Sequence, residues 1–272
     1  MRAILSEEQI QTARMFIFKS GRLLERQLFE YFFGDGTRQA CLKALRAYQN
    51  GDGGFGNGIE SDIMCPASSG IGAETALFML ELLDSQDTEL ANSLIKWIVA
   101  SQNAAGYIDH PPVNMEKYPV QPWWKKADQE RVLTLAGVMM KWGMGEAAFF
   151  EKVRALYLRM QVPEEIGFYS YPYFVYLKYC SGNEEDRVRY AQMVEGIPVL
   201  LEKHRDHFPL LNRAWFHAKE YVEREVLEQE AAIFVKAIHA DGDIDSPYPQ
   251  FPTWNPIFFL DGLILLKKEG YL

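Results

Sequence analysis

The sequence predicts an all-α protein, and three observations support this fold class. Apolar residues recur at the i, i+3, i+4, i+7 spacing of an amphipathic helix almost without interruption along the 272 residues. No segment shows the apolar–polar alternation of a half-buried strand. A glycine turn follows a helical segment at several places, which is typical of a repeat protein.

Each expected helix has its own run of apolar residues, and some have recognisable ends. Ser6, with Gln9 close behind it, is typical of an N-cap. Asn255-Pro256 places a proline in the first turn of a helix. In chain order, the expected helices span residues 6–18, 20–33, 37–50, 72–84, 87–103, 128–142, 145–161, 170–181, 185–203, 208–218, 221–240 and 255–268.

The turn after the third expected helix recurs along the chain. Its copies are "CLKALRAYQNGDGGFG" (41–56), "LIKWIVASQNAAGYI" (94–108), "LYLRMQVPEEIGFYSY" (156–171) and "FVKAIHADGDIDSPY" (234–248). A loop and a more apolar helix follow each copy, so the repeated unit is outer helix, turn, loop and inner helix. Twelve helices make six pairs, and we expect residues 1–272 to form a single domain, an (α6/α6) toroid closed into one ring.

The turn residues are explained by structure alone. In the first copy, the amides of Gln49 and Asn50 are expected to cap the helix end. Gly53 and Gly54 are expected to adopt positive φ, and the ring of Phe55 to fill the space between neighbouring helices.

Composition limits the partners. A net charge of −9 and a pI near 5.2 argue against nucleic acid, whose phosphates would be repelled. The longest apolar runs fall short of the roughly 20 residues that a membrane span needs, although contact with a membrane surface stays open.

The three scattered cysteines suggest no disulfide framework, and the N-terminal segment turns acidic too early for a signal peptide, so we expect a cytoplasmic protein. Aromatic residues make up 14% of the chain, which suggests a cavity walled by rings and a small, apolar ligand.

The stretch "QNGDGGFG", followed some way on by "ETALFMLELL", resembles the glutamine-aromatic repeat of the terpenoid cyclase and protein prenyltransferase β-subunit superfamily. Those α/α toroids use Gln-x-x-x-Gly-x-Trp/Phe turns and a following Thr-Ala-x-x-x-Leu helix. The resemblance implies an apolar, aromatic-lined central cavity that opens where the turns gather. It also implies an isoprenoid-handling enzyme or binder.

The candidate catalytic residues are three acids near the first turn. Class II terpenoid cyclases place Asp-x-Asp-Asp before Thr-Ala, but here Ala73 replaces the proton donor and only the last acid is kept, as Glu74. Catalysis therefore stays open: the activity is cyclase-like or prenyltransferase-like if the protein is an enzyme. Glu60 and Asp62 complete the expected acid cluster, because the turn itself needs neither of them. The alternative role of Glu74 is a helix-N-terminal carboxylate that favours the helix dipole.

The prenyltransferase branch implies zinc, held by Asp-x-Cys and a later histidine. In this chain Asp62 and Cys65 are one residue too far apart, and the helix expected at 128–142 has no histidine. His110 is the only histidine near a rim loop that we consider. We expect no metal and no cofactor, with zinc at Asp62 and Cys65 as the alternative to a small buried Cys65.

Aromatic residues cluster where the inner helices are expected to begin. Ring faces stabilise carbocations and also stack on sugars, although rings of this kind often serve helix packing. Two alternatives to the isoprenoid hypothesis therefore stay open: a carbohydrate-active hydrolase or lyase on an (α6/α6) barrel, and a non-catalytic ligand-binding or scaffolding toroid. The candidate substrate-binding residues are Trp123, Trp124, Asp128, Tyr171, Trp215 and Trp254.

Overall fold

The computed structural model describes residues 5–163, 170–204, 216–245 and 250–271. Within these ranges the regular structure is helical, and extended pairing is limited to three isolated bridges, Gln49–Phe55, Ile63–Val120 and Gln102–Ile108. The all-α prediction is confirmed for this part of the chain. None of the helices found there is long and apolar enough to cross a bilayer.

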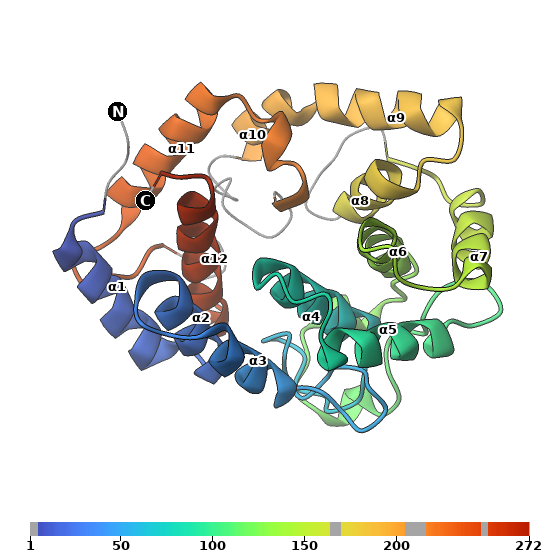
Figure 1. The fold of residues 1–272 in the computed structure, drawn as a ribbon, viewed down its shortest axis with the longest axis horizontal. Coiled ribbons are helices and arrows are strands. Elements are labelled where there is room, and N and C mark those ends of the chain that lie inside the picture. The colour runs from blue at the N-terminus through green and yellow to red at the C-terminus, as the bar shows by residue number, and fades with distance from the viewer. Residues whose placement is uncertain (1–4, 164–169, 205–215, 246–249, 272) are drawn as a thin grey trace. The chain divides into compact units, whose positions relative to one another are not determined.

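Figure 1 labels the α-helices in chain order. The short 3-10 helices whose bounds fall within the described residues lie in the connections: η1 (Met115–Lys117), η2 (Pro122–Lys125), η4 (Lys219–Tyr221) and η5 (Pro252–Trp254). The α-helices are α1 (Glu7–Ser20), α2 (Leu23–Phe33), α3 (Arg38–Arg46), α4 (Gly70–Leu82), α5 (Glu89–Ser101), α6 (Arg131–Lys141), α7 (Ala147–Tyr157), α8 (Tyr171–Cys180), α9 (Glu184–Glu195), α10 (Ile197–His204), α11 (Arg224–Ala237) and α12 (Asn255–Lys268).

The expected helix ends are confirmed at two places and corrected at a third. Ser6 and Gln9 form a capping box, in which Ser6 Oγ accepts from Gln9 N and Gln9 Oε1 accepts from Ser6 N. Helix α12 begins at Asn255 with proline in its first turn. The single helix expected at 185–203 is two helices, α9 and α10, because Pro198 has no N–H to continue the ladder. The helix expected at 208–218 lies mostly outside the described residues.

The chain divides into two compact units. Unit 1 comprises residues 1–44 and 197–272, and unit 2 comprises residues 45–196. The closed ring of six helix pairs, and with it the single domain, stays a prediction.

In unit 1, α12 packs against α1 and α2. The Phe259 ring lies 5.7 Å from Phe16 and 5.9 Å from Phe234, between centroids. In unit 2, α6 packs between α4 and α8 (Figure 1). An added Cβ at Gly137 would lie 2.7 Å from the Val175 carbonyl oxygen, so glycine allows α6 and α8 to approach closely.

The predicted inner helices are the more buried ones. Almost every residue of α4 is buried, and α12 is buried over most of its length. The outer helices α5 and α11, in contrast, bury one face and expose the other. The more apolar segments are thus the more buried helices, while their placement on the inside of a ring stays a prediction.

Three copies of the turn share one backbone geometry. The first residue donates its N–H to the carbonyl four positions on, and its own carbonyl accepts from the N–H three positions on, with N···O distances of 2.8 to 3.1 Å. In the first two copies the glutamine closes the turn, because Gln49 Nε2 donates to Gly53 O and Gln102 Nε2 to Gly106 O. In the first copy, Asn50 N donates to Gly54 O, and Asn50 O accepts from Gly53 N. In the same order, the residues are Asn103, Tyr107 and Gly106 in the second copy, and His239, Asp243 and Gly242 in the third. The remaining copy falls largely on residues 164–169, outside the described ranges.

The turn glycine also packs against the backbone of another outer helix. Its φ is 92° at Gly53, 101° at Gly106 and 82° at Gly242. A Cβ added at these glycines would lie 2.7 Å from Ser93 O of α5, 2.5 Å from Lys152 O of α7 and 2.5 Å from Thr12 O of α1, respectively.

The prediction that Gly54 adopts positive φ is wrong, because Gly54 is not among the glycines with positive φ. It is needed for a different reason: a Cβ there would lie 2.5 Å from the Trp97 ring.

Candidate functional site

A buried cluster of charged and aromatic side chains joins three inner helices of unit 2. Arg131 lies in the first turn of α6, and its Nη1 donates to Glu74 Oε2 on α4 (2.5 Å) and to the Tyr171 hydroxyl on α8 (2.8 Å). Its Nε donates to Asp128 Oδ2 (3.0 Å), and Asp128 Oδ1 also accepts from the Arg131 backbone N–H. The guanidinium carbon lies 5.9 Å from the Trp124 ring and 5.8 Å from the Tyr171 ring. We call Glu74, Asp128, Arg131 and Tyr171 the arginine cluster.

One cation serves two carboxylates in the arginine cluster. The side chains of Arg131, Glu74 and Asp128 are only 17%, 14% and 16% exposed. Burial raises the pKa of the Glu74 carboxyl, and the positive charge of Arg131 opposes this shift. Burial alone would lower the pKa of the Arg131 guanidinium, but the charges of Glu74 and Asp128 hold that pKa well above its usual value. Burial also raises the pKa of the Tyr171 hydroxyl, and the negative charge of Glu74 adds to this rise.

One oxygen of Glu74 is unused within the described residues. Glu74 Oε1 is buried and makes no hydrogen bond of standard geometry there, whereas Oε2 is paired with Arg131; the hydroxyls of Tyr171 and Thr134 still act to lower the pKa of Glu74. A buried carboxylate oxygen without a donor is costly when it is charged and much less so when it is protonated. Burial and the unpaired oxygen both act to raise the pKa of the Glu74 carboxyl, and the ion pair with Arg131 acts against them.

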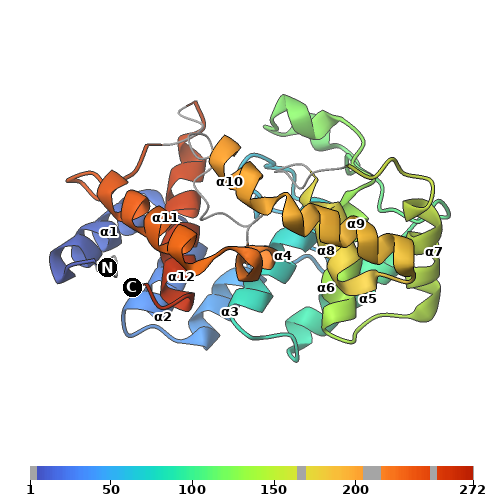
Figure 2. The same ribbon diagram turned by 90° about the horizontal axis from the view of Figure 1, so that it is seen from above.

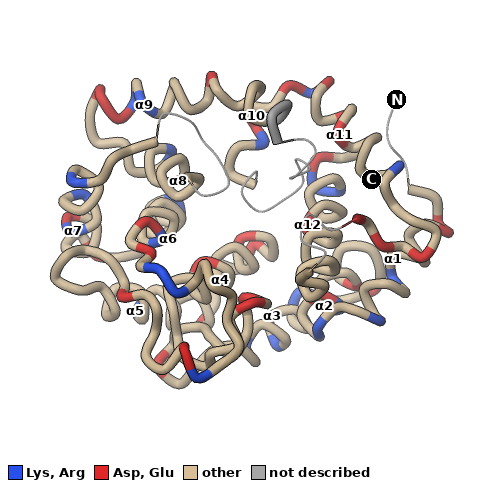
Figure 3. Tube along the Cα trace, turned by 180° about the vertical axis from the view of Figure 1, so that it is seen from behind, with Lys and Arg blue, Asp and Glu red and all other residues tan. Residues whose placement is uncertain are grey.

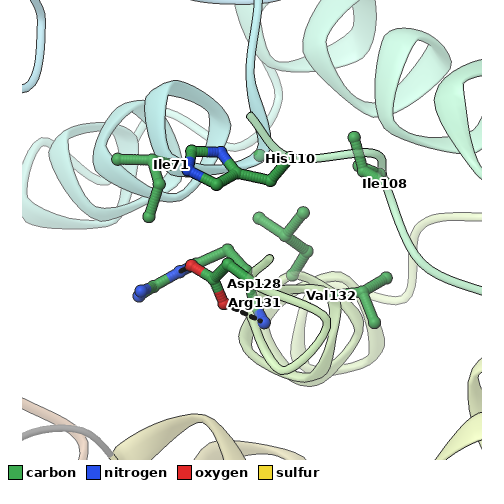
Figure 4. Close-up of a pocket in the computed structure, with 8 residues that line it drawn as sticks. Ile71, Ile108, His110, Asp128, Arg131 and Val132 are labelled. Atoms are coloured by element: carbon green, nitrogen blue, oxygen red, sulfur yellow. Dashed lines mark hydrogen bonds and ion pairs between the residues drawn. The ribbon is translucent and has the colours of Figure 1, made fainter. Parts of the chain in front are cut away.

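A narrow pocket lies beside the arginine cluster. Figure 4 shows the His110 ring on one side of this pocket and Asp128 and Arg131 on the other. Apolar side chains and one glycine form the rest of its lining: Gly70, Ile71, Ile108, Val132 and Leu135. Glu74 is not one of the lining residues; it lies about one helical turn beyond Gly70 on α4 and reaches the pocket wall through its ion pair with Arg131.

His110 presents a free lone pair. Its Nε2 lies 2.7 Å from the Trp124 carbonyl oxygen, and because a carbonyl only accepts, Nε2 carries the proton. Nδ1 is then the acceptor in the neutral ring, and it is buried without a hydrogen-bond partner in the described part of the chain. Burial lowers the pKa of His110, which keeps the ring neutral.

Glu60 and Asp62, the other two predicted acids, do not contact Arg131; each binds a residue next to the arginine cluster. Glu60 Oε2 accepts from the Thr75 hydroxyl at 2.5 Å, and Thr75 directly follows Glu74 on α4. Asp62 accepts from the indole of Trp124, the ring that lies near Arg131. The three predicted acids thus lie around the first turns of α4 and α6, but each has its own partner.

Asp62 holds two tryptophans at once. Its Oδ1 accepts from Trp124 Nε1 (2.7 Å) and its Oδ2 from Trp123 Nε1 (3.1 Å). Asp62 is 7% exposed, and its carbonyl also accepts from Gln121 N. These bonds fasten the loop that carries η2 to the loop that precedes α4.

We expect Asp62→Asn to lower the free energy of unfolding by about 1–3 kcal/mol, because the amide NH₂ would face an indole N–H and leave a buried donor unpaired. Urea denaturation followed by circular dichroism measures this. Asp109→Asn is the control, since Asp109 is exposed and its side chain accepts a hydrogen bond from Asn103 Nδ2. Equal losses in the two variants would contradict a clamping role for Asp62.

The residues considered for zinc have other partners. Both oxygens of Asp62 accept from indoles, and Cys65 is buried in an apolar cluster with Ile63, Ile71 and Met115. Among the described residues, no group of three or more histidine, cysteine, aspartate or glutamate side chains is placed to hold a metal ion.

Two of the predicted substrate-binding residues are not part of the site described above. Trp254 belongs to unit 1, where its ring stacks on Phe258 at 5.1 Å. Trp215 lies outside the described residues. The structure brings Trp124, Asp128 and Tyr171 together at Arg131, with Trp123 beside Asp62.

Sequence reasoning missed Arg131, the centre of the site. Its signal was present: a cation opens the apolar run "RVLTLAGVMM", three residues after Asp128. Glu74 and Arg131 are charged residues of opposite sign near the starts of two apolar helices, which indicates a pair. His110 was considered only as a metal ligand, whereas its position indicates a hydrogen-bond acceptor.

Comparison with known proteins gives no match for this chain, either among models of protein families or among curated proteins. The class that the structure itself defines is an all-α helical-repeat protein with a buried arginine cluster beside an apolar pocket. Membership in the terpenoid cyclase superfamily stays a prediction.

Proposed function

We propose that this protein is an acid–base enzyme that protonates a small, mainly apolar substrate of the isoprenoid class, with Glu74 as the proton donor. The observation that carries this proposal is the sharing of one guanidinium, Arg131, by two buried carboxylates, of which Glu74 keeps an unpaired buried oxygen. One guanidinium can neutralise only one carboxylate, so the second carboxylate has no cation of its own. A general acid needs a raised pKa, and burial supplies it at Glu74.

The pocket lining supports an apolar substrate. Five of its lining residues are aliphatic or glycine, and its polar groups are confined to His110, Asp128 and Arg131. The pocket is too narrow to hold a water molecule, so the proposal requires the loop carrying Ile108 and His110 to move aside when a substrate binds.

The chemistry balances within the chain's own residues. The proton on Glu74 transfers to one carbon of a C=C bond, which leaves a carbocation on the other carbon and a carboxylate beside Arg131. Loss of a proton from a neighbouring carbon to His110 Nδ1 then gives the isomerised or cyclised product. Exchange with solvent afterwards removes the proton from His110 and returns one to Glu74, which restores the starting state of both residues. The lone pair of neutral His110 suits this role because its other nitrogen is occupied by the Trp124 carbonyl.

A carbohydrate-active hydrolase is the second candidate, favoured by one observation. Glu74 and Asp128 both bind Arg131, so two carboxylates converge as glycoside hydrolysis requires. In that mechanism each acid contacts the sugar. In isoprenoid protonation Asp128 only positions Arg131, so Asp128→Asn would weaken the reaction less than Glu74→Gln.

We expect Glu74→Gln to lower turnover about 10²-fold or more, because glutamine keeps the size of the side chain but has no ionisable proton. The assay incubates the protein with squalene or geranylgeraniol in D₂O and measures deuterium in the recovered lipid by mass spectrometry. Incorporation by the wild type and its loss in Glu74→Gln is the expected result. Equal incorporation in both proteins would exclude Glu74 as the donor, and hydrolysis of a glycan panel without deuterated lipid would favour the second candidate.

The pH dependence of stability tests the state of Glu74 without a substrate. Folding raises the pKa of Glu74 above its ordinary 4.5, so the folded state binds this proton more tightly than the unfolded state. The stabilisation is fully present below pH 4.5 and is lost as the pH rises through the folded pKa. We therefore expect the wild type to lose free energy of unfolding relative to Glu74→Gln as the pH increases. A difference independent of pH would contradict the raised pKa.

A further inference from the structure

Helices α4 and α6 of unit 2 are joined by an ion pair near each end. Figures 1 and 2 both show the two helices next to one another, and they are in contact. Glu74 pairs with Arg131 near their starts, and Glu81 pairs with Lys141 near their ends. The two helices therefore run in the same direction, and the face of α6 that carries its two cations is turned towards α4.

Thr134 is the one polar side chain between the charged ends of α6. The charged residues of α4 and α6 are those of the two ion pairs (Figure 3), and the other residues of α6 are apolar or glycine. Arg131, Thr134 and Lys141 stand at positions i, i+3 and i+10, which lie on one face of a helix. The Thr134 side chain thus faces α4 as the two cations do. Thr134 is 3% exposed, so its hydroxyl needs a partner within the protein.

The hydroxyl of Thr134 and one oxygen of Glu74 are buried groups of complementary kind. A threonine within a helix can donate to the carbonyl four residues earlier, but Thr134 Oγ1 makes no hydrogen bond of standard geometry in the described part of the chain. The same holds for Glu74 Oε1. A hydroxyl donates and a carboxylate oxygen accepts, and the two residues lie on facing sides of α4 and α6. Pairing them would satisfy both groups at once.

We propose that Thr134 is a positioning residue for Glu74: its hydroxyl donates to Glu74 Oε1 and holds the carboxylate that remains once Glu74 has given up its proton. The proposal rests on the proposed function, in which Glu74 is the proton donor. A hydroxyl rotates to suit its partner, so Thr134 can accept from a protonated Glu74 and donate to an ionised one. Thr134 does not line the pocket, so it acts through Glu74 and not on the substrate.

The other groups that act on Glu74 come from α6, from the loop before it and from α8. Burial raises the pKa of the Glu74 carboxyl, the charge of Arg131 and the hydroxyls of Tyr171 and Thr134 lower it, and the charge of Asp128 adds to the rise. Thr134 is uncharged and is not bonded to Arg131. Its replacement therefore changes the hydrogen bonding of Glu74 without changing the charge of the arginine cluster.

Thr134→Val tests the pairing without a substrate, because valine keeps the branched shape of threonine and removes the hydroxyl. Folding raises the pKa of Glu74 above 4.5, so the stabilisation from this group is present below pH 4.5 and is lost as the pH rises through the folded pKa. Loss of the donor raises the folded pKa further, so the loss becomes larger. We expect the free energy of unfolding of Thr134→Val to fall increasingly below that of the wild type between pH 4.5 and pH 7, as measured by urea denaturation.

Two controls separate this effect from simple loss of packing. Thr134→Ser keeps the hydroxyl and loses a methyl group, so its stability should differ from the wild type by an amount that does not depend on pH. In the Glu74→Gln background, which lacks the ionisable group, Thr134→Val should likewise have an effect independent of pH. A deficit of Thr134→Val that stays constant with pH, or that grows equally in either control, would overturn the pairing of Thr134 with Glu74.

Turnover in the deuterium assay distinguishes the positioning role from the proposed reaction. Thr134→Val should lower kcat about tenfold with KM little changed, since a hydrogen bond to the charged form is lost and Thr134 does not line the pocket. Thr134→Ser should recover most of the activity. An unchanged kcat in Thr134→Val would overturn the positioning role. No incorporation by the wild type would overturn the proposed reaction, and with it the role of Thr134 in that reaction, while the pH dependence of stability still decides whether the two side chains pair.

Discussion

Replacement of Arg131 by methionine is expected to lower the free energy of unfolding by about 3–5 kcal/mol, which is typical when one partner of a buried ion pair is removed. Methionine preserves much of the volume of the arginine stem, so the loss comes mainly from charge and hydrogen bonds. Without the guanidinium, Glu74 and Asp128 are two buried carboxylates with no cation, and the Tyr171 hydroxyl loses its donor. Urea denaturation at pH 7 measures the change.

The pH dependence of this variant provides a second check. Loss of Arg131 removes the charge that opposes the rise in the pKa of Glu74, so that pKa rises further. A folded pKa above the unfolded one means stability that is present at low pH and is lost as the pH increases. The deficit of Arg131→Met should therefore be smallest near pH 4.5 and grow towards pH 7.

A double-mutant cycle supplies the control. Combining Arg131→Met with Glu74→Gln removes both charges of one pair, and the double variant should be more stable than the sum of the single losses predicts. Strict additivity of the two losses would show that Arg131 and Glu74 do not interact in solution.

Replacement of Gly53 by alanine is expected to cost about 2–5 kcal/mol, and two effects combine in this loss. The φ of 92° places an alanine in a strained region, at about 1–2 kcal/mol. The new Cβ would also lie 2.6 Å from Ser93 Oγ and 2.7 Å from Ser93 O, so α5 would have to move, at about 1–3 kcal/mol. Thermal and urea unfolding measure the loss.

Gly51→Ala is the matched control, in the same turn. Gly51 is exposed, is not among the residues with positive φ, and an added Cβ there meets nothing within 4 Å. We expect this variant to stay within roughly 0.5 kcal/mol of the wild type. A similar loss in both variants would mean that the turn does not depend on close approach to α5.

Local patterns in the sequence were enough for the helices. The apolar period, the Ser6 cap and the proline at Asn255-Pro256 depend on residues within a few positions of one another, and the structure has helices there. The turn at Gln49 to Phe55 is also local, because the glutamine amide and the glycine act within seven positions. For these features, proximity in sequence is proximity in space.

Tertiary packing decided the rest, because the decisive partners are distant in sequence. Glu74 and Arg131 are separated by 57 positions, and Arg131 and Tyr171 by 40, so no window of sequence contains the arginine cluster. The sequence predicts Asp62 as a member of the catalytic acid cluster, yet the partners of a carboxylate depend on which side chains fold onto it, and the indoles of Trp123 and Trp124 both donate to Asp62.

The sequence by itself thus determined an all-α chain, its more buried and less buried helices and its repeated glycine turn, since backbone hydrogen bonding and apolar periodicity act over one or two helical turns. Only the tertiary structure decided that Gly53 rather than Gly54 needs positive φ, that Arg131 joins Glu74 to Asp128, and that His110 keeps a free lone pair. The physical reason is that burial and charge pairing are properties of the space around a residue, which several distant segments build together.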